Sequence, residues 1–163
     1  MVVPYAFLLL LFFLNGVSIP TPVSVVFKAP FFLMAVYYWS VYRPTFIPAL
    51  LVCLAGFVLD FLDGTPMGAN AFLFLLCRMI VVDQRRYLVS QTFSMIWLGF
   101  VFLHVLFLCL KWVIYSIVYF TWTAVPEMPY SLFFGFALFP LIYVLLHMAH
   151  KMLPAPSLKG KPL

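Results

Sequence analysis

Charged residues are scarce in this chain, and acidic residues are the scarcest. Only 8% of its 163 residues are charged, and Asp and Glu together number four against nine Lys and Arg. A soluble domain carries about 25% charged residues, so this composition excludes a soluble globular protein. The mean hydropathy of +1.18 and the hydrophobic content of 67% instead indicate an integral membrane protein.

The sequence also lacks the motifs that indicate an enzyme or a metalloprotein. It contains no G-x-S-x-G, no glycine-rich phosphate loop, no H-E-x-x-H and no C-x-x-C. Its three cysteines, Cys53, Cys77 and Cys109, lie within apolar runs, which is typical of packing residues rather than of disulfides or a zinc site. We therefore expect no catalytic residue, no cofactor and no metal.

Long apolar runs are abundant, and they predict six transmembrane helices. A helix needs about 20 mainly apolar residues to cross a hydrocarbon core of about 30 Å. The predicted spans cover residues 2–19, 24–42, 45–62, 66–83, 92–120 and 129–150. The expected fold is an all-α membrane bundle forming one domain over 1–150, followed by a basic, Pro-rich cytoplasmic tail over 151–163.

Basic residues between the spans predict the orientation, because Lys and Arg are retained on the cytoplasmic side. With six spans, both termini share one side of the membrane. That side also carries six basic residues, namely Arg43, Arg85, Arg86, Lys151, Lys159 and Lys161. The opposite side carries Lys28 alone. We therefore expect a multi-pass protein with both termini in the cytoplasm.

The third predicted span carries a stripe of small and acidic residues. Its members recur every three or four residues and so share one helix face: Ala49, Cys53, Gly56, Asp60 and Asp63. Small residues let helices approach closely, and ionisable residues within a span usually face protein. We expect Asp60 to point into the bundle, where it contacts either a partner protein or a buried cation.

Lys111 on the fifth span is the better candidate for that cation. Counting about 1.5 Å per residue places Asp60 and Lys111 in the outer half of the membrane, and Arg78 nearer the cytoplasm. Asp60 and Lys111 are therefore a candidate buried ion pair, for which a structural salt bridge is the simpler interpretation. Arg78 is the other candidate cation, and it is equally expected to extend toward Asp83 and the inner headgroups instead.

The turn after the third span reads as helix-capping chemistry. We expect Gly64 to end the third helix, Thr65 to cap the fourth, and Pro66 to occupy its first position. Asp63, just before the new helix, has a structural interpretation as a partner of the helix dipole.

Two features stand close together in the middle of the chain. An aromatic-rich segment ends in Tyr38 and Trp39 and is followed by Pro44. The pattern G-x-x-x-D-x-x-x-G-x-x-x-G then fits four positions: Gly56, Asp60, Gly64 and Gly68. In both features, residues 29–90 resemble the rod-shape-determining protein MreD family of bacteria. Asp60 takes the family's acidic position.

Two residues do not follow the resemblance. Asp63 has no fixed counterpart in the family, and Arg78 departs from its usual fourth span. The resemblance implies a non-enzymatic inner-membrane scaffold of the cell-elongation machinery. It also implies as partners MreC, the MreB filament, the wall synthase RodA and a transpeptidase penicillin-binding protein, with no role for nucleic acid. The family is similar in helix arrangement to the substrate-binding component of energy-coupling vitamin transporters.

The residues and the resemblance together predict interaction sites at both membrane faces. The outer site is expected to contact MreC and comprises Asp60, Asp63, Thr65, Pro66, Met67 and Gly68. On the other face, Arg43, Arg85 and Arg86 are expected to meet cytoplasmic partners or anionic lipid. The alternative function is the substrate-binding membrane subunit of a small-molecule, vitamin-type transporter.

Overall fold

The computed structural model describes residues 9–14, 18–20, 26–28, 30–45, 47–120 and 127–151. Helices account for most of them: α2 (Phe31–Tyr42), α3 (Ala49–Asp63), α4 (Ala69–Leu88), α5 (Phe93–Tyr119) and α6 (Glu127–Lys151). Residues 9–14 form a further helical segment. Two short strands, β1 (Ser18–Pro20) and β2 (Val26–Lys28), pair antiparallel. The helical class is confirmed, and the strand pair was not predicted.

The prediction of a single helical span over 24–42 is wrong in its first part. Residues 26–28 are strand β2, and α2 begins only at Phe31 with Pro30 at its N-cap position. The β-branched and aromatic residues of Val26–Lys28 favour extended backbone, whereas proline is well tolerated at a helix start. The predicted first span, 2–19, is helical over 9–14 and reaches β1 at Ser18, and its other residues lie outside the described part.

Two of the helices are long and apolar enough to cross a membrane, namely Phe93–Tyr119 and Met128–His150. The apolar helix α2 has 12 residues and so extends for about 18 Å, which is shorter than a hydrocarbon core of about 30 Å. The membrane class is thus supported by α5 and α6, and the complete set of six spans stays a prediction. The predicted tail lies outside the described residues after Lys151.

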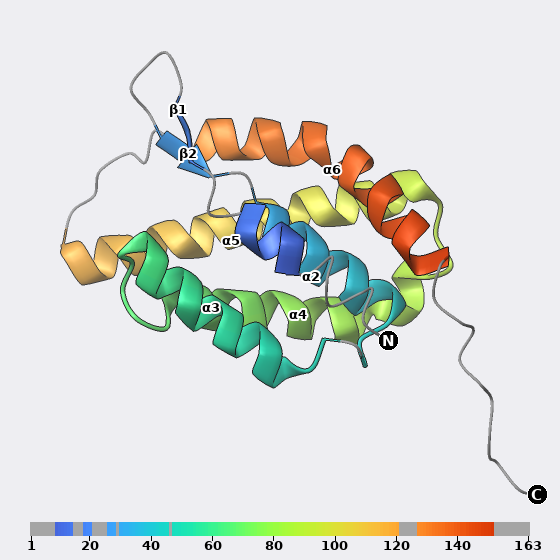
Figure 1. Cartoon of the computed structure of the whole chain (residues 1–163), viewed down its shortest axis with the longest axis horizontal. Helices are drawn as coiled ribbons and strands as arrows, with labels where there is room; N and C mark the ends of the chain where they lie inside the picture. The colour runs from blue at the N-terminus through green and yellow to red at the C-terminus, as the bar shows by residue number, and fades with distance from the viewer. Residues whose placement is uncertain are drawn as a thin grey trace, which may run out of the picture.

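Helix α2 lies at the centre of the bundle. Figure 1 shows it between α6 on one side and the pair α3 and α4 on the other, and it contacts α4, α5 and α6. Ten consecutive residues, from Phe32 to Val41, are buried. A helix that is apolar on every face is expected to be buried in this way.

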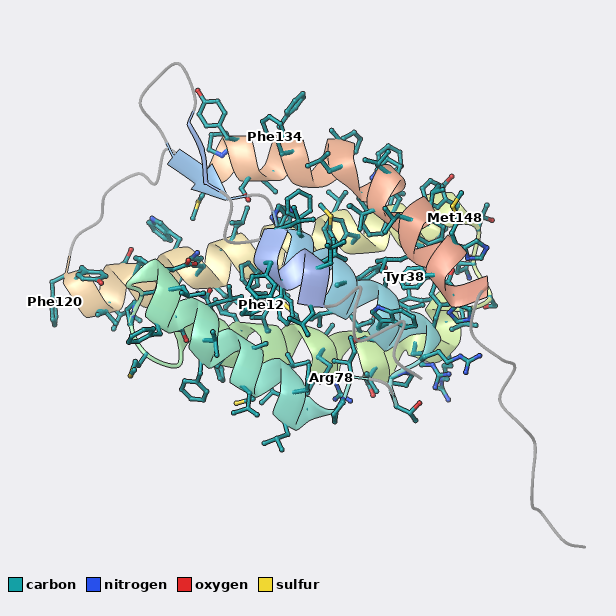
Figure 2. All side chains as sticks on the ribbon, in the orientation of Figure 1. Phe12, Tyr38, Arg78, Phe120, Phe134 and Met148 are labelled. Atoms are coloured by element: carbon teal, nitrogen blue, oxygen red, sulfur yellow. The ribbon has the colours of Figure 1, made fainter. Side chains whose placement is uncertain are left out.

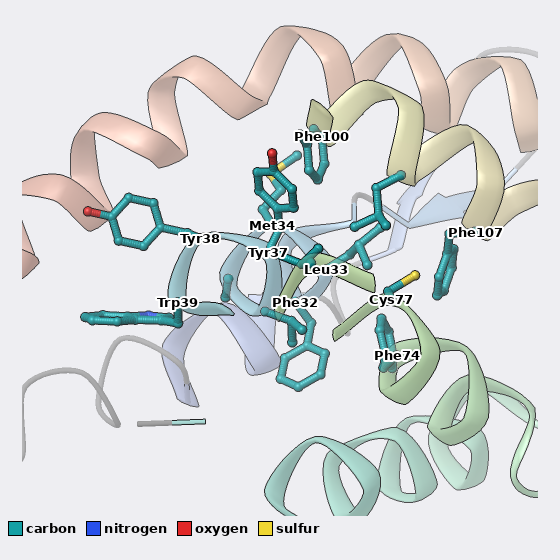
Figure 3. Close-up of a cluster of buried hydrophobic side chains, with 14 of the residues drawn as sticks. Phe32, Leu33, Met34, Tyr37, Tyr38, Trp39, Phe74, Cys77, Phe100 and Phe107 are labelled. Carbon is teal, nitrogen blue, oxygen red and sulfur yellow. The ribbon is translucent and has the colours of Figure 1, made fainter. Parts of the chain in front are cut away.

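Aromatic side chains form much of the core around α2. Phe32 meets Phe74 of α4 edge-on, with ring centroids 5.0 Å apart, and Tyr37 meets Phe100 of α5 at 5.6 Å. Figure 3 shows Tyr37 pointing toward Phe100, and Phe74 gathered with Cys77 and Phe107. Such edge-to-face and offset pairs are the preferred aromatic geometries. They tie α2 to both α4 and α5.

The residues predicted to lie outside the membrane and those predicted to lie in the cytoplasm are at opposite ends of the bundle. Figure 1 shows the connection from α3 to α4 at one end, with the end of α5 and the start of α6. The ends of α2, α4 and α6 lie at the other. Figure 2 likewise places Phe120 and Met148 toward opposite ends. Below, "the α3–α4 corner" means residues 60–70, and "the basic end" means the end that carries Arg43, Arg85 and Arg86.

Candidate functional site

The carboxylate of Asp60 organises the α3–α4 corner. Its Oδ1 accepts hydrogen bonds from the Thr65 hydroxyl at 2.6 Å and the Asn70 backbone N–H at 3.0 Å. Its Oδ2 accepts one from the Gly68 backbone N–H at 2.9 Å. The side chain is only 1% exposed. Asp60, at the end of α3, therefore caps the free N–H groups at the start of α4, where the helix dipole favours negative charge.

The three glycines of the family pattern have separate structural roles around this carboxylate. Gly64 has φ of 64° and ends α3, and Gly68 has φ of 92° and begins α4. Both values lie in the left-handed region, which glycine adopts without steric cost. At Gly56 an added Cβ would lie 2.6 Å from the backbone nitrogen of Ala71, so only glycine allows α3 and α4 to approach this closely.

The prediction for the end of α3 is confirmed, and the prediction for the start of α4 is wrong. Gly64 takes the expected left-handed C-cap position. Helix α4 begins at Ala69 with Gly68 as its N-cap, three residues later than predicted. Thr65 donates to Asp60 instead of capping α4, and the Pro66 carbonyl accepts from the Ala69 N–H at 3.0 Å. The cap comes from the preceding helix, which local sequence rules do not anticipate.

Helix α5 brings Lys111 and Tyr115 to the same corner. The Tyr115 side chain lies near Thr65, Asp63 and Asp60. The Lys111 ammonium lies 5.8 Å from the centroid of the Tyr115 ring, within cation–π range. Asp60's described hydrogen bonds all go to the corner itself. The Asp60–Lys111 ion pair therefore stays a prediction.

Met67 is the most exposed of the residues predicted to form the outer site. Its side chain is 78% exposed, whereas Thr65, Pro66 and Gly68 are half-buried. Asp63 is also half-buried. Of the six residues predicted to form the outer site, Met67 thus offers the largest accessible surface and Asp60 the smallest.

Two arginines of α4 bind backbone carbonyls at the end of α2 and in the segment that follows it. Arg85 Nε donates to the Val41 carbonyl near the end of α2 at 3.0 Å. Arg78, labelled in Figure 2, donates through Nε to the Ile47 carbonyl at 2.8 Å and through Nη2 to the Pro44 carbonyl at 3.5 Å. These contacts give Arg78 a role that the sequence did not indicate, because it binds backbone carbonyls in place of the expected contact with Asp83.

The other two predicted basic residues differ in exposure. Arg86 is exposed, and its guanidinium lies 5.0 Å from the centroid of the Tyr87 ring and donates to the Tyr87 hydroxyl at 3.0 Å. Arg43 is half-buried at the C-cap of α2. The described residues contain no group of three or more His, Cys, Asp or Glu side chains that could hold a metal ion.

Residues 1–149 match the family described as rod shape-determining protein MreD. The chain belongs to the MreD family. Membership of the MreD family implies a role in rod-shape determination within the shape-determining complex. MreD proteins are membrane-associated and belong to a structural family rather than an enzyme family. No curated protein and no solved structure matches the chain, so the similarity to vitamin transporters stays a prediction.

Several polar contacts between helices of this MreD-family chain were not predicted. The buried His104 of α5 lies with Nε2 3.4 Å from the Ser131 hydroxyl of α6. Tyr42 of α2 and Tyr143 of α6 share a hydrogen bond of 2.7 Å between their hydroxyls. Polar residues commonly join helices within membranes by hydrogen bonds, so each polar residue in an apolar run indicates a contact between helices. The sequence alone did not identify which residues pair.

Proposed function

We propose that this chain is a non-enzymatic scaffold subunit of the bacterial cell-elongation machinery, which directs peptidoglycan synthesis along the side wall. In this proposal it spans the inner membrane several times with both termini in the cytoplasm. It binds MreC and links MreC to RodA and a transpeptidase penicillin-binding protein, with MreB as a further partner. Family membership supports the role in shape determination, and the two ends of the bundle supply the contact surfaces.

The observation that carries the proposal is the pre-formed α3–α4 corner. Asp60 fixes its backbone through three hydrogen bonds, and Met67 projects from it with 78% of its side chain exposed. A surface that is already ordered loses little conformational freedom when it binds, and methionine adapts to irregular apolar partners. We assign Met67 as the MreC contact and Asp60 as the residue that holds the corner, because Asp60 is buried.

The basic end is the proposed cytoplasmic face. Arg86 is exposed there, Arg43 is half-buried, and α6 ends at Lys151 on the same side. This asymmetry of basic residues supports cytoplasmic termini. Arg86 is the residue best placed to meet anionic headgroups or an acidic cytoplasmic partner, whereas Arg85 is engaged with the Val41 carbonyl.

The test is affinity purification of the tagged protein from native membranes, followed by mass spectrometry of the captured proteins. Met67→Ser should reduce recovery of MreC several-fold without lowering the amount of protein in the membrane. The matched control is Met95→Ser, because Met95 is 55% exposed at the start of α5, at the opposite end of the bundle. Met95→Ser should leave recovery of MreC unchanged.

The outcomes separate the proposed contact from folding and from transport. Equal recovery of MreC with Met67→Ser and wild type would refute the corner as the contact surface. Equal loss with both Met variants would indicate a general effect on the protein rather than a contact. Recovery of ATPase subunits in place of MreC would refute the scaffold function, and saturable uptake of a small solute by vesicles would then be measured.

A further inference from the structure

Pro140 interrupts the hydrogen-bond ladder of α6. Proline has no backbone N–H, so the carbonyl four residues earlier, that of Phe136, loses its donor within the helix. The proline ring also crowds that carbonyl, and so the helix bends at this point. In a membrane-spanning helix, a neighbouring helix is one of the sources that replace the missing donor.

Trp97 of α5 supplies that donor. Its indole Nε1 donates to the Phe136 carbonyl at 3.3 Å. The Trp97 and Phe136 rings also contact each other, with centroids 4.4 Å apart and planes inclined by 33°. The Phe136 carbonyl, which Pro140 leaves without a donor inside α6, therefore accepts a hydrogen bond from a side chain of α5.

The two parts of α6 on either side of this point make their polar contacts with different helices, α5 before it and α2 after it. Before it, Ser131 and Gly135 lie against His104 of α5. After it, Tyr143 shares a hydrogen bond with Tyr42, and His147 Nδ1 lies 3.5 Å from the Tyr38 hydroxyl. Figure 1 shows α6 changing direction part-way along, so that its later half turns toward the basic end.

We propose that Trp97 is a positioning residue that fixes the bend in α6 by replacing the N–H that Pro140 lacks. The bend directs residues 141–151 onto the end of α2. It thereby sets where the chain leaves the bundle toward its basic, Pro-rich tail. Trp97 acts through the Phe136 carbonyl and need not touch any partner of the protein, so this inference stands whether or not MreC binds the α3–α4 corner.

A double-mutant cycle tests the proposal in the purified full-length protein. In the wild-type background Trp97→Phe removes both the donor and part of the ring packing. In the Pro140→Ala background the Phe136 carbonyl regains its helical donor, so the same substitution removes packing alone. We expect Trp97→Phe to lower the melting temperature by about 2–4 °C more in the wild-type background than in the Pro140→Ala background.

The control for the cycle is Trp112→Phe on the same helix, which should lower the melting temperature equally in both backgrounds. If Pro140→Ala does not accumulate in membranes, Pro140→Gly replaces it, because glycine also restores the N–H. An equal loss for Trp97→Phe in both backgrounds would overturn the proposal, since it would assign the whole effect to packing.

A distance measurement tests the direction of α6 separately from stability. Spin labels are placed at Met148 on α6 and Met79 on α4, which are 61% and 63% exposed, with Cys53, Cys77 and Cys109 replaced by Ala. Pro140→Ala should shift the mean distance between the labels. Trp97→Phe should broaden the distance distribution only where Pro140 is present. An unchanged mean distance in Pro140→Ala, or equal broadening in both backgrounds, would overturn the proposal.

Discussion

The α3–α4 corner and the basic end satisfy helix ends with side chains of opposite charge. At the corner, the carboxylate of Asp60 accepts from N–H groups at the start of α4. At the basic end, Arg85 and Arg78 donate to carbonyls at the end of α2 and in the loop that follows. The contacts of Asp60 and Arg85 match the helix dipole, which favours anions at a helix start and cations at a helix end.

The two regions differ in how far along the chain these contacts reach. Asp60 binds groups five, eight and ten residues away, and it is buried. Arg78 and Arg85 are half-buried and bind carbonyls 31 and 44 residues away. The corner is therefore a buried local unit, whereas the basic end joins segments that are distant in the sequence. The stability of the corner should therefore depend on Asp60 more strongly than the stability of the basic end depends on Arg78 and Arg85.

Asp60→Ala should have the largest effect of the substitutions that compare the two regions. It leaves the N–H groups of the half-buried Gly68 and the buried Asn70 without an acceptor, and we expect it to destabilise the protein by about 2–4 kcal/mol. Asp60→Asn retains one acceptor oxygen and should cost about half as much. Thermal unfolding in mild detergent measures both.

Asp63→Ala is the matched control for Asp60→Ala, because it removes the same group three residues away from a half-buried position. It should cost less than half as much. If the two alanine substitutions are equally mild, the hydrogen bonds of Asp60 do not hold the corner.

Arg78→Leu should have an intermediate effect, about 1–2 kcal/mol, because it removes the donor to the Ile47 carbonyl. An apolar environment favours leucine over arginine, so a loss of stability in Arg78→Leu would come from the lost hydrogen bonds. Arg78→Lys should restore part of the loss, since one ammonium can reach one carbonyl but lacks the planar fork of arginine. Equal stability of Arg78→Leu and wild type would contradict this role.

Arg86→Ala should have the smallest effect on stability, within about 0.5 kcal/mol, because the side chain is exposed. It should instead lower the affinity for bound anionic lipid by about fivefold, which corresponds to about 1 kcal/mol for one basic residue near a charged surface. Native mass spectrometry of co-purified lipid measures this, and Gln84→Ala, also exposed, is the neutral control. Unchanged lipid retention in Arg86→Ala would remove Arg86 from the proposed cytoplasmic surface.

Local sequence rules predicted the parts of the fold that depend on a single residue. Gly64 was correctly placed at the end of α3, and Asp60 was correctly turned into the bundle. The start of α4 was predicted wrongly because its cap comes from Asp60, eight residues before the N-cap Gly68. A rule that considers only the residues next to a helix start cannot find such a cap.

Contacts between distant segments could not be predicted from the sequence, for a physical reason. In a membrane protein, lipid-facing and buried positions are both apolar, so hydropathy does not show which helix faces which. The targets of Arg78 are backbone carbonyls, which every residue has. Pro140 in the sequence implies that a carbonyl four residues earlier, at Phe136, lacks its helical donor, but only the structure identifies Trp97 as the replacement donor.

The short reach of Asp60 also has a consequence for how the protein is made. A carboxylate that enters a membrane before its partners exist would be strongly unfavourable there. All three groups that bind Asp60 belong to residues 65–70, so they leave the ribosome immediately after it. In the predicted six-span arrangement, the α3–α4 hairpin can therefore close around Asp60 before α5 and α6 have been synthesised.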